Sequence, residues 1–428
     1  MVMARRQYIS RIIDTELDTL LPILPAIALE GAKGVGKTAT AARRAVTVHA
    51  LDRPGALDLA GADPQRLISG RRPVLIDEWQ RMPQSWDLVR RAVDADPSPR
   101  QFLLAGSASP RTPGTHSGAG RIVRLKMRPL SLIERTGGVP TVSLGHLLRG
   151  TREPVVGSTS QSLDDYAAEV CASGLPGLRG MHPRAIRAEL DGYLDLITDR
   201  DFAEMGQAVR RPGTLRRWMT AYAAATATTA SYDVVRDAAT PGGGEKPART
   251  TIQVYRDILE RLWILEPLPA WLPTHNHLRR LSAAPKHHLV DPALAARLLG
   301  VDTSGLLDAR SARPSIARDT TLIGQLFESL ITLSVRVYAQ AAEARVNHLR
   351  THAGEHEVDL IVERGDHRIL AIEIKLAATV GDRDVRHLRW LAERVGADLL
   401  DAVVITTGTD AYRRPDGVAV VPAALLGP

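Results

Sequence analysis

The residue types and spacing of a phosphate-binding loop occur near the start of the chain, in Gly31-Ala32-Lys33-Gly34-Val35-Gly36-Lys37-Thr38. Glycines let successive backbone N–H groups turn toward phosphate oxygens, and the N-terminus of a following helix adds positive potential. Lys37 is expected to reach the β- and γ-phosphates, and the Thr38 hydroxyl is expected to ligate Mg²⁺. The alternative is a chance glycine-rich turn, but the apolar run 27–29 and the helix-like run 38–44 flank the loop as a strand and a helix would. The loop therefore predicts a site for ATP with Mg²⁺.

A second chemical pattern follows at residues 73–78, where a buried-strand run ends in two carboxylates, Asp77 and Glu78. Asp77 is expected to help hold Mg²⁺, and Glu78 to orient and polarise the attacking water. An apolar run ending in Asp-Glu is a weak signal by itself, but downstream of a phosphate-binding loop it predicts hydrolysis as well as binding.

Two further candidates come from the order of elements, which resembles that of AAA+ ATPases. The strand-like run 101–107 ends in Ser107, where such ATPases carry a polar sensor for water near the γ-phosphate; a serine that only caps the next turn is the alternative. Gly120-Arg121 precedes the strand-like run 122–125, where AAA+ proteins carry an arginine finger that reaches the nucleotide of a neighbouring subunit. If Arg121 has that role, the protein forms a homo-oligomer.

The C-terminal third contains a second constellation of charged residues. Asp359 lies in the strand-like run 357–362, and Glu373 and Lys375 lie in the run 369–375; the two runs read as a hairpin. Residues i and i+2 of a strand share a face, so Glu373 and Lys375 point the same way. Asp359, Glu373 and Glu328 of the preceding amphipathic helix are candidate Mg²⁺ ligands, and Lys375 could activate water for phosphodiester hydrolysis. A salt-bridged hairpin is the alternative, although burying such charges in an apolar strand without a role is costly.

The sequence divides into four predicted domains. They are an AAA+ core at 1–135, a connector and helical lid at 136–205, a winged-helix domain at 206–283 and a nuclease-like domain at 284–428. The winged helix is expected from helices at 214–229, 232–239 and 250–262 followed by strand-like residues 263–266. Its last helix has few cations, which favours a connector over a DNA-binding module.

Composition limits the function classes. A net charge of +7 and a pI near 9.7 fit either DNA or RNA binding or an ordinary arginine-rich surface. Only six of the 55 basic residues are lysine, so lysines that persist are expected where a compact ammonium is needed; Lys37 and Lys375 fit this. The single Cys171 excludes an internal disulfide, and no apolar run approaches a membrane span. We expect a cytoplasmic protein without a membrane partner.

Together these residues resemble bacterial and archaeal AAA+ ATPases fused to a winged helix and a PD-(D/E)xK nuclease-like C-terminal domain of unknown function. The landmarks that carry the resemblance are residues 31–38, 75–80, 104–107, 120–121, 130–134, 289–292, 357–359 and 372–375. It implies an α/β chain with a P-loop core and a restriction-endonuclease-like C-terminal domain.

The leading functional prediction is an ATP-hydrolysing protein whose nucleotide state controls a Mg²⁺-dependent nuclease-like domain acting on nucleic acid. The alternative is a nucleotide-driven switch or scaffold that binds a protein partner and cleaves nothing. The intact Asp359, Glu373 and Lys375 set favours the first prediction, and the lack of a strong basic stripe favours the second.

Overall fold

The computed structural model describes residues 8–107, 119–207, 209, 211–240, 246–272, 283–307, 321–351 and 354–428. The chain forms two compact units. The first comprises Met1–Pro129 with Leu175–Gly177 and Leu259–Trp263, and the second comprises Leu130–Gly174, Leu178–Ile258 and Ile264–Pro428.

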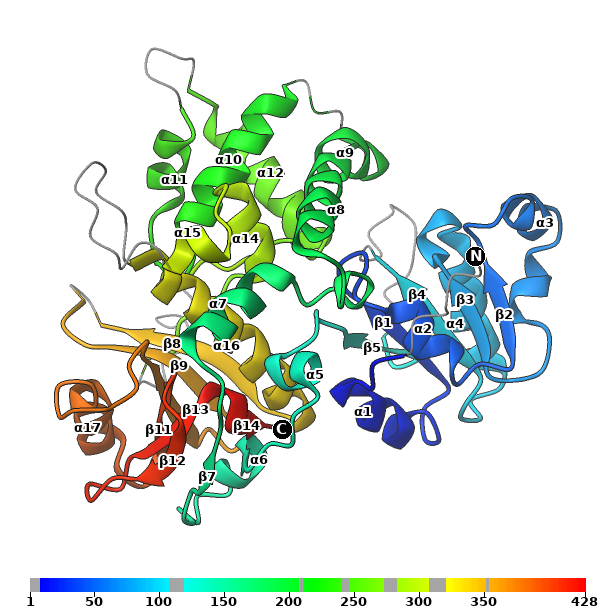
Figure 1. Ribbon diagram of the computed structural model, residues 1–428. Coiled ribbons are helices and arrows are strands. Elements are labelled where there is room, and N and C mark those ends of the chain that lie inside the picture. Colours follow the sequence, from blue (N-terminus) through cyan, green and yellow to red (C-terminus); the bar gives the residue numbers. More distant parts are fainter. Residues whose placement is uncertain are drawn as a thin grey trace. The chain divides into compact units, whose positions relative to one another are not determined.

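The first unit is built on a five-stranded parallel sheet in the order β2-β3-β4-β1-β5 (Figure 1). Its strands are β1 (Ala26–Glu30), β2 (Thr47–Ala50), β3 (Val74–Asp77), β4 (Phe102–Gly106) and β5 (Ile122–Lys126). Its helices are α1 (Ile12–Leu20), α2 (Lys37–Ala42), α3 (Ala56–Ala62) and α4 (Gln84–Ala95), with the short 3₁₀ turns η1 (Pro64–Ile68) and η2 (Trp79–Arg81).

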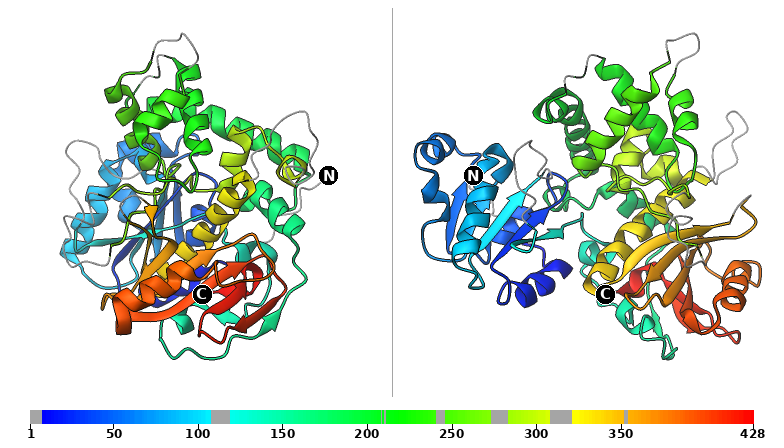
Figure 2. Two further views of the ribbon diagram at one scale, coloured as in Figure 1. Left: turned by 90° about the vertical axis from the view of Figure 1, so that its left-hand side faces the viewer. Right: turned by 180° about the vertical axis from the view of Figure 1, so that it is seen from behind.

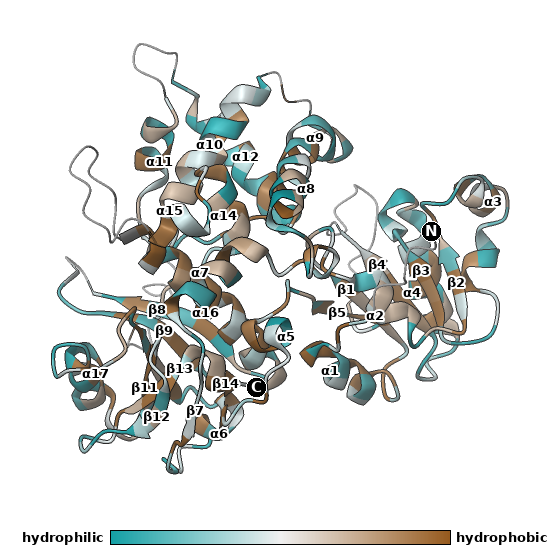
Figure 3. Ribbon diagram, viewed as in Figure 1, coloured by the Kyte–Doolittle hydropathy of each residue, from teal (hydrophilic) through white to brown (hydrophobic). Residues whose placement is uncertain are grey.

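The central strands explain why this sheet could be predicted. Every residue of β1, β3 and β4 is buried, as expected for a parallel sheet that helices cover on both faces, so these strands read as continuous apolar runs. Figure 3 shows β3 in the hydrophobic colour. Parallel strands place their carboxyl ends at one edge, so the loops that follow β1, β3 and β4 meet there.

The second unit contains a seven-stranded mixed sheet in the order β7-β12-β13-β11-β10-β9-β8. Its strands are β7 (Gly157–Ser158), β8 (Arg345–Arg350), β9 (Glu357–Glu363), β10 (Ile369–Ile374), β11 (Leu399–Thr406), β12 (Asp410–Arg413) and β13 (Ala419–Pro422). The predicted hairpin is present as the antiparallel pair β9–β10, whereas β10–β11 and β11–β13 are parallel. α16 (Thr321–Ala341) and α17 (Arg386–Val395) lie on opposite sides of this sheet (Figure 2).

α16 corrects one expectation from the sequence. Its segment Leu322–Ala341 is long and apolar enough to cross a membrane by length and composition, and 72% of the window that passes this test is buried inside the structure. Arg336 on this helix is itself buried and donates to the backbone carbonyls of Glu266 and Pro267. α16 is therefore packed here as a core helix.

The remaining helices of the second unit precede α16 in the chain. They are α5 (Leu132–Thr136), α6 (Leu144–Leu147), α7 (Leu163–Ala172), α8 (Pro183–Leu196), the π-helical turn η4 (Ile197–Asp201), α9 (Phe202–Glu204), α10 (Pro212–Ala224), α11 (Tyr232–Ala238), α12 (Arg249–Arg261), α14 (Pro292–Leu298) and α15 (Thr303–Leu307). The last turn of α12, from Leu259 onward, belongs to the first unit. α8 and α17 show both hydrophilic and hydrophobic colour, as amphipathic helices do (Figure 3).

The three helices expected in the winged-helix segment 206–283 are present as α10, α11 and α12. The strand-like residues after α12 pair outside this segment, because Leu265 bridges to Leu289 and Leu268 to Lys286. Residues 273–282, where a second wing strand would lie, fall outside the described residues. The winged-helix interpretation stays a prediction.

Two short strands connect distant parts of the second unit. β7 pairs with β12, and β6 (Val142–Ser143) pairs in parallel with β14 (Leu426–Gly427). Residues 142–158 thus complete structure made by the C-terminal segment, so the predicted connector and the predicted nuclease-like domain share one folded unit.

Candidate nucleotide site and C-terminal charge cluster

The predicted phosphate-binding loop joins the end of β1 to the start of α2. Gly34 and Gly36 have φ angles of +81° and +99°, in the left-handed region that favours glycine, and Gly36 is the residue that directly precedes α2. The loop therefore has the strand–loop–helix context in which backbone N–H groups and a helix N-terminus converge on a phosphate.

Lys37 points back into this loop. Its Nζ donates to the carbonyl oxygens of Gly31 and Ala32, both at 2.8 Å, and the residue is only 6% exposed. Burial lowers the pKa of Lys37 to about 8, with the negative charges of Glu78 and Asp77 opposing the shift. The loop's own carbonyl groups accept hydrogen bonds from the ammonium that is expected to contact phosphate.

Thr38 and Asp77 lie together beside Lys37. The Thr38 hydroxyl donates to Asp77 Oδ1 at 2.9 Å, and Asp77 ends β3 at the carboxyl edge of the sheet. Burial raises the pKa of Asp77, and the hydrogen bond from Thr38 opposes that shift. A hydroxyl and a carboxylate in contact are oxygen donors suited to Mg²⁺, so these residues fit the predicted ion.

Glu78 is held by a residue that sequence reasoning did not select. Gln80 Nε2 donates to Glu78 Oε2 and, at 3.3 Å, to Ser107 Oγ, so Gln80 joins the predicted catalytic base to the predicted sensor. Glu78 also has a left-handed backbone with φ +55°, an uncommon conformation for a non-glycine residue that is concentrated at functional sites. Glu78, Gln80 and Ser107 therefore form one small polar group.

Gly106 allows this group to form. A Cβ at Gly106 would lie 2.4 Å from Trp79 Nε1 and 2.6 Å from Gln80 Oε1, so only glycine lets η2 pack this closely on β4. Trp79 is buried and contacts Trp86 of α4, with ring centroids 4.9 Å apart. The apolar packing of the tryptophans thus fixes the position of Gln80.

Arg11 is a second residue that sequence reasoning missed. Its guanidinium is buried and donates to the carbonyl oxygens of Val35 (2.8 Å) and Arg128 (2.7 Å), which ties the phosphate-binding loop to the end of the first unit. The sequence offers no signal for this role, because the chain is rich in arginine and Arg11 precedes an ordinary amphipathic helix.

Arg121 lies away from the loop of its own chain. It precedes β5, and β5 pairs in parallel with β1 so that Ile122 lies beside Ala26 at the amino end of the sheet. The phosphate-binding loop follows the carboxyl end, five residues or roughly 16 Å away along β1. The Arg121 side chain is 46% exposed and pairs with Asp94 at 2.7 Å. The arginine-finger role of Arg121 therefore stays a prediction, and it requires a second copy of the chain.

The C-terminal candidates form a buried charge cluster, and an unpredicted lysine lies at its centre. The 1% exposed Lys286 places its Nζ 2.9 Å from Glu328 Oε1, 2.9 Å from Glu357 Oε1 and 3.1 Å from Asp359 Oδ1. Lys375 Nζ is 2.6 Å from Glu373 Oε1.

Backbone contacts complete the cluster. Asp359 Oδ2 accepts the Ile374 N–H at 2.9 Å, which holds Asp359 against the end of β10, next to Glu373. The sequence-predicted residues Glu328, Asp359, Glu373 and Lys375 therefore come from α16, β9 and the end of β10 into one region.

Electrostatics within the cluster follow from burial and from the two ammonium groups. Burial would lower the pKa of Lys286, but the carboxylates of Asp359, Glu328 and Glu357 raise it well above its ordinary value. Burial would raise the pKa of Asp359, but Lys286 and Lys375 lower it. Burial and then the Asp359 charge raise the pKa values of Glu328 and Glu373 to about 8. The cluster thus balances its charge internally.

The Lys286 ammonium contacts two of the three carboxylates that are predicted to ligate Mg²⁺, Glu328 and Asp359. Among the described residues, no group of three or more His, Cys, Asp or Glu side chains is placed to hold a metal ion. Joint ligation of Mg²⁺ by Glu328, Asp359 and Glu373 stays a prediction. The rarity of lysine in this chain is the sequence signal that could have found Lys286.

The first unit resembles a known protein family. Residues 24–136 match a family model described as an AAA domain, which supports an AAA-type, nucleotide-binding ATPase domain. Residues 163–305 match a domain of unknown function, DUF8612, and residues 323–426 match another, DUF4143. Neither description names a winged helix or a nuclease.

Two curated relatives match most of the chain. The uncharacterized proteins Mb2031c of Mycobacterium bovis and Rv2008c of Mycobacterium tuberculosis are each 28% identical over 408 residues, covering 93% of this chain and 80% of the relative. Among solved structures, two variants of Thermotoga maritima RuvB match with 17% identity and a TM-score of 0.26, covering 60% of this chain and 89% and 87% of theirs. That score is too low to carry an argument.

Proposed function

We propose that this chain is an ATP-hydrolysing switch, in which an AAA-type core changes state with its nucleotide and the C-terminal charge cluster is a structural, non-cleaving centre. The observation that carries the first half is the convergence of Lys37, Thr38, Asp77 and Glu78 at the carboxyl edge of the parallel sheet. These residue types match the steps that phosphoryl transfer requires.

Each residue has a separate role in the proposed reaction. Lys37 exchanges its bonds with Gly31 and Ala32 for bonds to the β- and γ-phosphates. Thr38 and Asp77 hold Mg²⁺, which when bound neutralises charge on the phosphate oxygens. Glu78 orients the attacking water, and Ser107 lies beside it through Gln80. Because Gln80 engages the Glu78 carboxylate, that contact must loosen before Glu78 can accept a hydrogen bond from water.

Arg121 completes the proposal if the protein self-associates. Its exposed guanidinium cannot reach the loop of its own chain, but it could approach the γ-phosphate of a neighbouring copy after leaving Asp94. ATP-dependent homo-oligomers are therefore part of the proposal.

Lys286 is the observation that favours a non-cleaving C-terminal part. A metal-dependent nuclease needs carboxylate oxygens that are free to ligate, whereas Lys286 contacts Glu328, Glu357 and Asp359. Removing a buried partner from such a cluster is unfavourable, so an entering cation would have to displace a fixed ammonium. On this reading the partner of the switch is another protein.

The neighbouring pair Glu373 and Lys375, in contact at 2.6 Å near Asp359, is what favours the competing nuclease function. Cleavage therefore has to be tested directly, together with hydrolysis. The purified protein is assayed for ATP turnover and for cleavage of single- and double-stranded DNA and RNA with Mg²⁺ or Mn²⁺, each with and without ATP.

Glu78→Gln should retain ATP binding and lose turnover by roughly a hundredfold or more, because the removed group acts on the attacking water. Glu189→Gln, on α8 in the second unit, is the matched control and should hydrolyse ATP like the wild type. Unchanged turnover in Glu78→Gln would remove the proposed base. Nucleic-acid cleavage that disappears in Lys375→Ala would replace the switch by an ATP-linked nuclease.

A further inference from the structure

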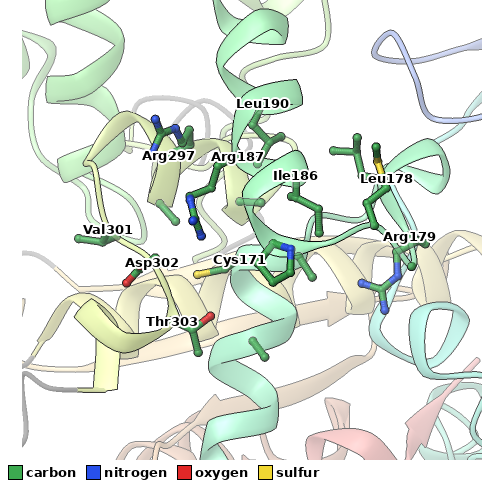
Figure 4. A pocket seen from close by; sticks show the side chains of 17 residues that line it. Cys171, Leu178, Arg179, Ile186, Arg187, Leu190, Arg297, Val301, Asp302 and Thr303 are labelled. Atoms are coloured by element: carbon green, nitrogen blue, oxygen red, sulfur yellow. The ribbon is translucent and has the colours of Figure 1, made fainter.

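The second unit contains a cavity that the proposed ATPase does not use. It measures about 230 Å³ and lies between α7, the residues leading into α8, α14 and the segment that opens α15 (Figure 4). Most of its wall is apolar, with Leu178, Ile186, Leu190 and Val301 among the lining side chains.

Small residues on two helices explain why the space is open. Ala168 and Ala172 line it from α7, and Ala293 and Ala296 line it from α14. The cavity is partly open to solvent, and these four methyl groups leave room for it between the two helices. Its volume lies below the roughly 300–1,000 Å³ of drug-sized ligand sites, so a ligand must be small.

The polar groups in the wall are not equivalent. Arg179 is bound by Glu169 through two contacts of 2.8 Å, and Arg297 is bound by Asp191 through two contacts of 2.6 Å. Arg187 of α8 also lines the cavity, yet it has no hydrogen-bond or ion-pair partner in the described part of the chain. The cavity therefore contains one cation whose charge no neighbouring carboxylate satisfies.

An acidic group faces the same space. Asp302 uses Oδ1 to accept the Gly305 N–H at 2.9 Å, and its Oδ2 has no hydrogen-bond partner within the described residues. Figure 4 shows the Arg187 guanidinium and the Cys171 thiol turned toward one part of the cavity, with Asp302 on the segment beside it. Arg187 is half-buried and Asp302 is exposed, and within the described residues they do not pair with each other, so both keep hydrogen-bonding capacity for a molecule in the cavity.

Cys171 does not supply covalent chemistry here. Burial raises the pKa of its thiol to about 11, with the Thr303 hydrogen bond opposing the shift, so the sulfur is an uncharged thiol at neutral pH. A thiol in that state is a poor nucleophile and behaves as a small apolar lining group. The ligand is therefore held by reversible contacts.

We propose that this cavity binds a free apolar α-amino acid. Its carboxylate would pair with Arg187, its ammonium with Asp302, and its side chain would lie against Leu178, Ile186 and Leu190. A zwitterion with one apolar branch matches a site that has one unpaired cation, one spare carboxylate oxygen and an apolar wall. A guanidinium is well suited to the carboxylate because it offers parallel N–H donors.

Calorimetry on the full-length protein tests this assignment with three probes that share one side chain. L-Leucine carries both charges, 4-methylpentanoate lacks the ammonium, and 3-methylbutylamine lacks the carboxylate. We expect saturable binding of L-leucine and roughly tenfold weaker binding of each analogue, because each analogue lacks one of the two charge-assisted contacts.

Variants locate the binding. Arg187→Gln and Asp302→Asn should each weaken L-leucine binding roughly ten- to a hundredfold, and Asn can still accept the Gly305 N–H. Ala296→Leu should abolish it by filling the space. Arg184→Gln, exposed on the same helix, is the matched control and should bind like the wild type. Thermal melting of each variant establishes that it is folded.

Three results would overturn the proposal. They are the absence of saturable binding by L-leucine and by its valine, isoleucine and methionine counterparts, equal binding of 4-methylpentanoate, and unchanged binding in Arg187→Gln. ATP turnover is measured in parallel with Glu78→Gln, so a failure of this proposal is distinguished from a failure of the proposed ATPase.

Discussion

Replacing Lys286 by methionine tests whether the ammonium holds the C-terminal cluster together. The change keeps the length and apolar character of the side chain but removes the cation from contacts of 2.9, 2.9 and 3.1 Å with three carboxylates. Breaking a buried ionic cluster by removing one partner costs about 3–5 kcal/mol, because the remaining charge is left uncompensated. At 1.36 kcal/mol per tenfold change, that range corresponds to roughly a hundred- to several-thousand-fold larger population of opened structure.

Hydrogen exchange followed by mass spectrometry measures this loss where it occurs. Amides of β9 and β10 should lose protection by that factor in Lys286→Met, while amides of β1 and β4 in the first unit keep theirs. Lys246→Met is the matched control. Lys246 is 46% exposed where it pairs with Asp237, so this change should cost about 1 kcal/mol or less.

The pH dependence of the loss gives the sharper test. In the wild type, Lys286 has a raised pKa, so its contribution to the stability of the folded state is fully present at every pH below the ordinary lysine range. Without Lys286, the pKa of Asp359 loses the main charge that lowers it and should rise with those of its buried neighbours. A carboxyl group whose pKa is higher in the folded state than in the unfolded state destabilises the fold as pH rises. The stability that Lys286→Met loses relative to the wild type should therefore grow from pH 5 to pH 8. Equal protection in both proteins, or a deficit independent of pH, would refute the reasoning.

Three further predictions concern the ATPase. Burial lowers the pKa of Lys37 to about 8 and phosphates favour its charged form, so ATP binding above pH 8 should take up close to one proton and weaken as pH rises. Calorimetry in two buffers of different ionisation heat measures this, and Lys37→Met should show no uptake. Gln80→Ala frees the Glu78 carboxylate and should raise basal ATP turnover up to about tenfold, because one charged hydrogen bond no longer has to break. Lower turnover at unchanged KM would mean that Gln80 itself positions the attacking water. Arg121→Ala should lower turnover only at protein concentrations where the wild type associates, as judged by light scattering; an equal loss in dilute monomer would exclude a finger acting between copies.

The sequence predicts the elements whose physical cause is local. β1, β3 and β4 are continuous apolar runs because both of their faces are buried, and the glycines of the phosphate-binding loop stand where positive φ angles are needed. The β9–β10 hairpin could also be predicted from a local pattern, because two apolar strands flank a short polar turn.

Contacts between residues far apart in the chain could not be predicted in this way. Lys286 contacts Glu328 and Asp359, which lie 42 and 73 positions further along the chain, and the segment around Lys286 has no periodicity that marks this residue as special. Gln80 reaches Ser107 across 27 positions, and only the packing of Trp79 on Gly106 directs it there. The long N-terminal stretch of the first compact unit ends at Pro129, and α5 after it packs on the second unit, where the Leu132 backbone N–H donates to Ser334 Oγ of α16.

The pairing of β6 with β14 has a consequence for how the protein is made. Ser143 contacts Pro428 across 285 positions, and Tyr166 contacts Ala424 across 258. The second unit therefore cannot complete its fold until the C-terminal segment has also left the ribosome. At about 5–20 residues per second, roughly 15 to 60 s separate the synthesis of the two sides of that contact. During this interval the partners of β6 and β7 do not yet exist. The first unit, which needs only short pieces from later in the chain, can take shape much sooner. Chaperone demand should therefore concentrate on residues 130 onward, and truncation just before β14 should yield aggregation of the second unit while the parallel sheet of the first still forms.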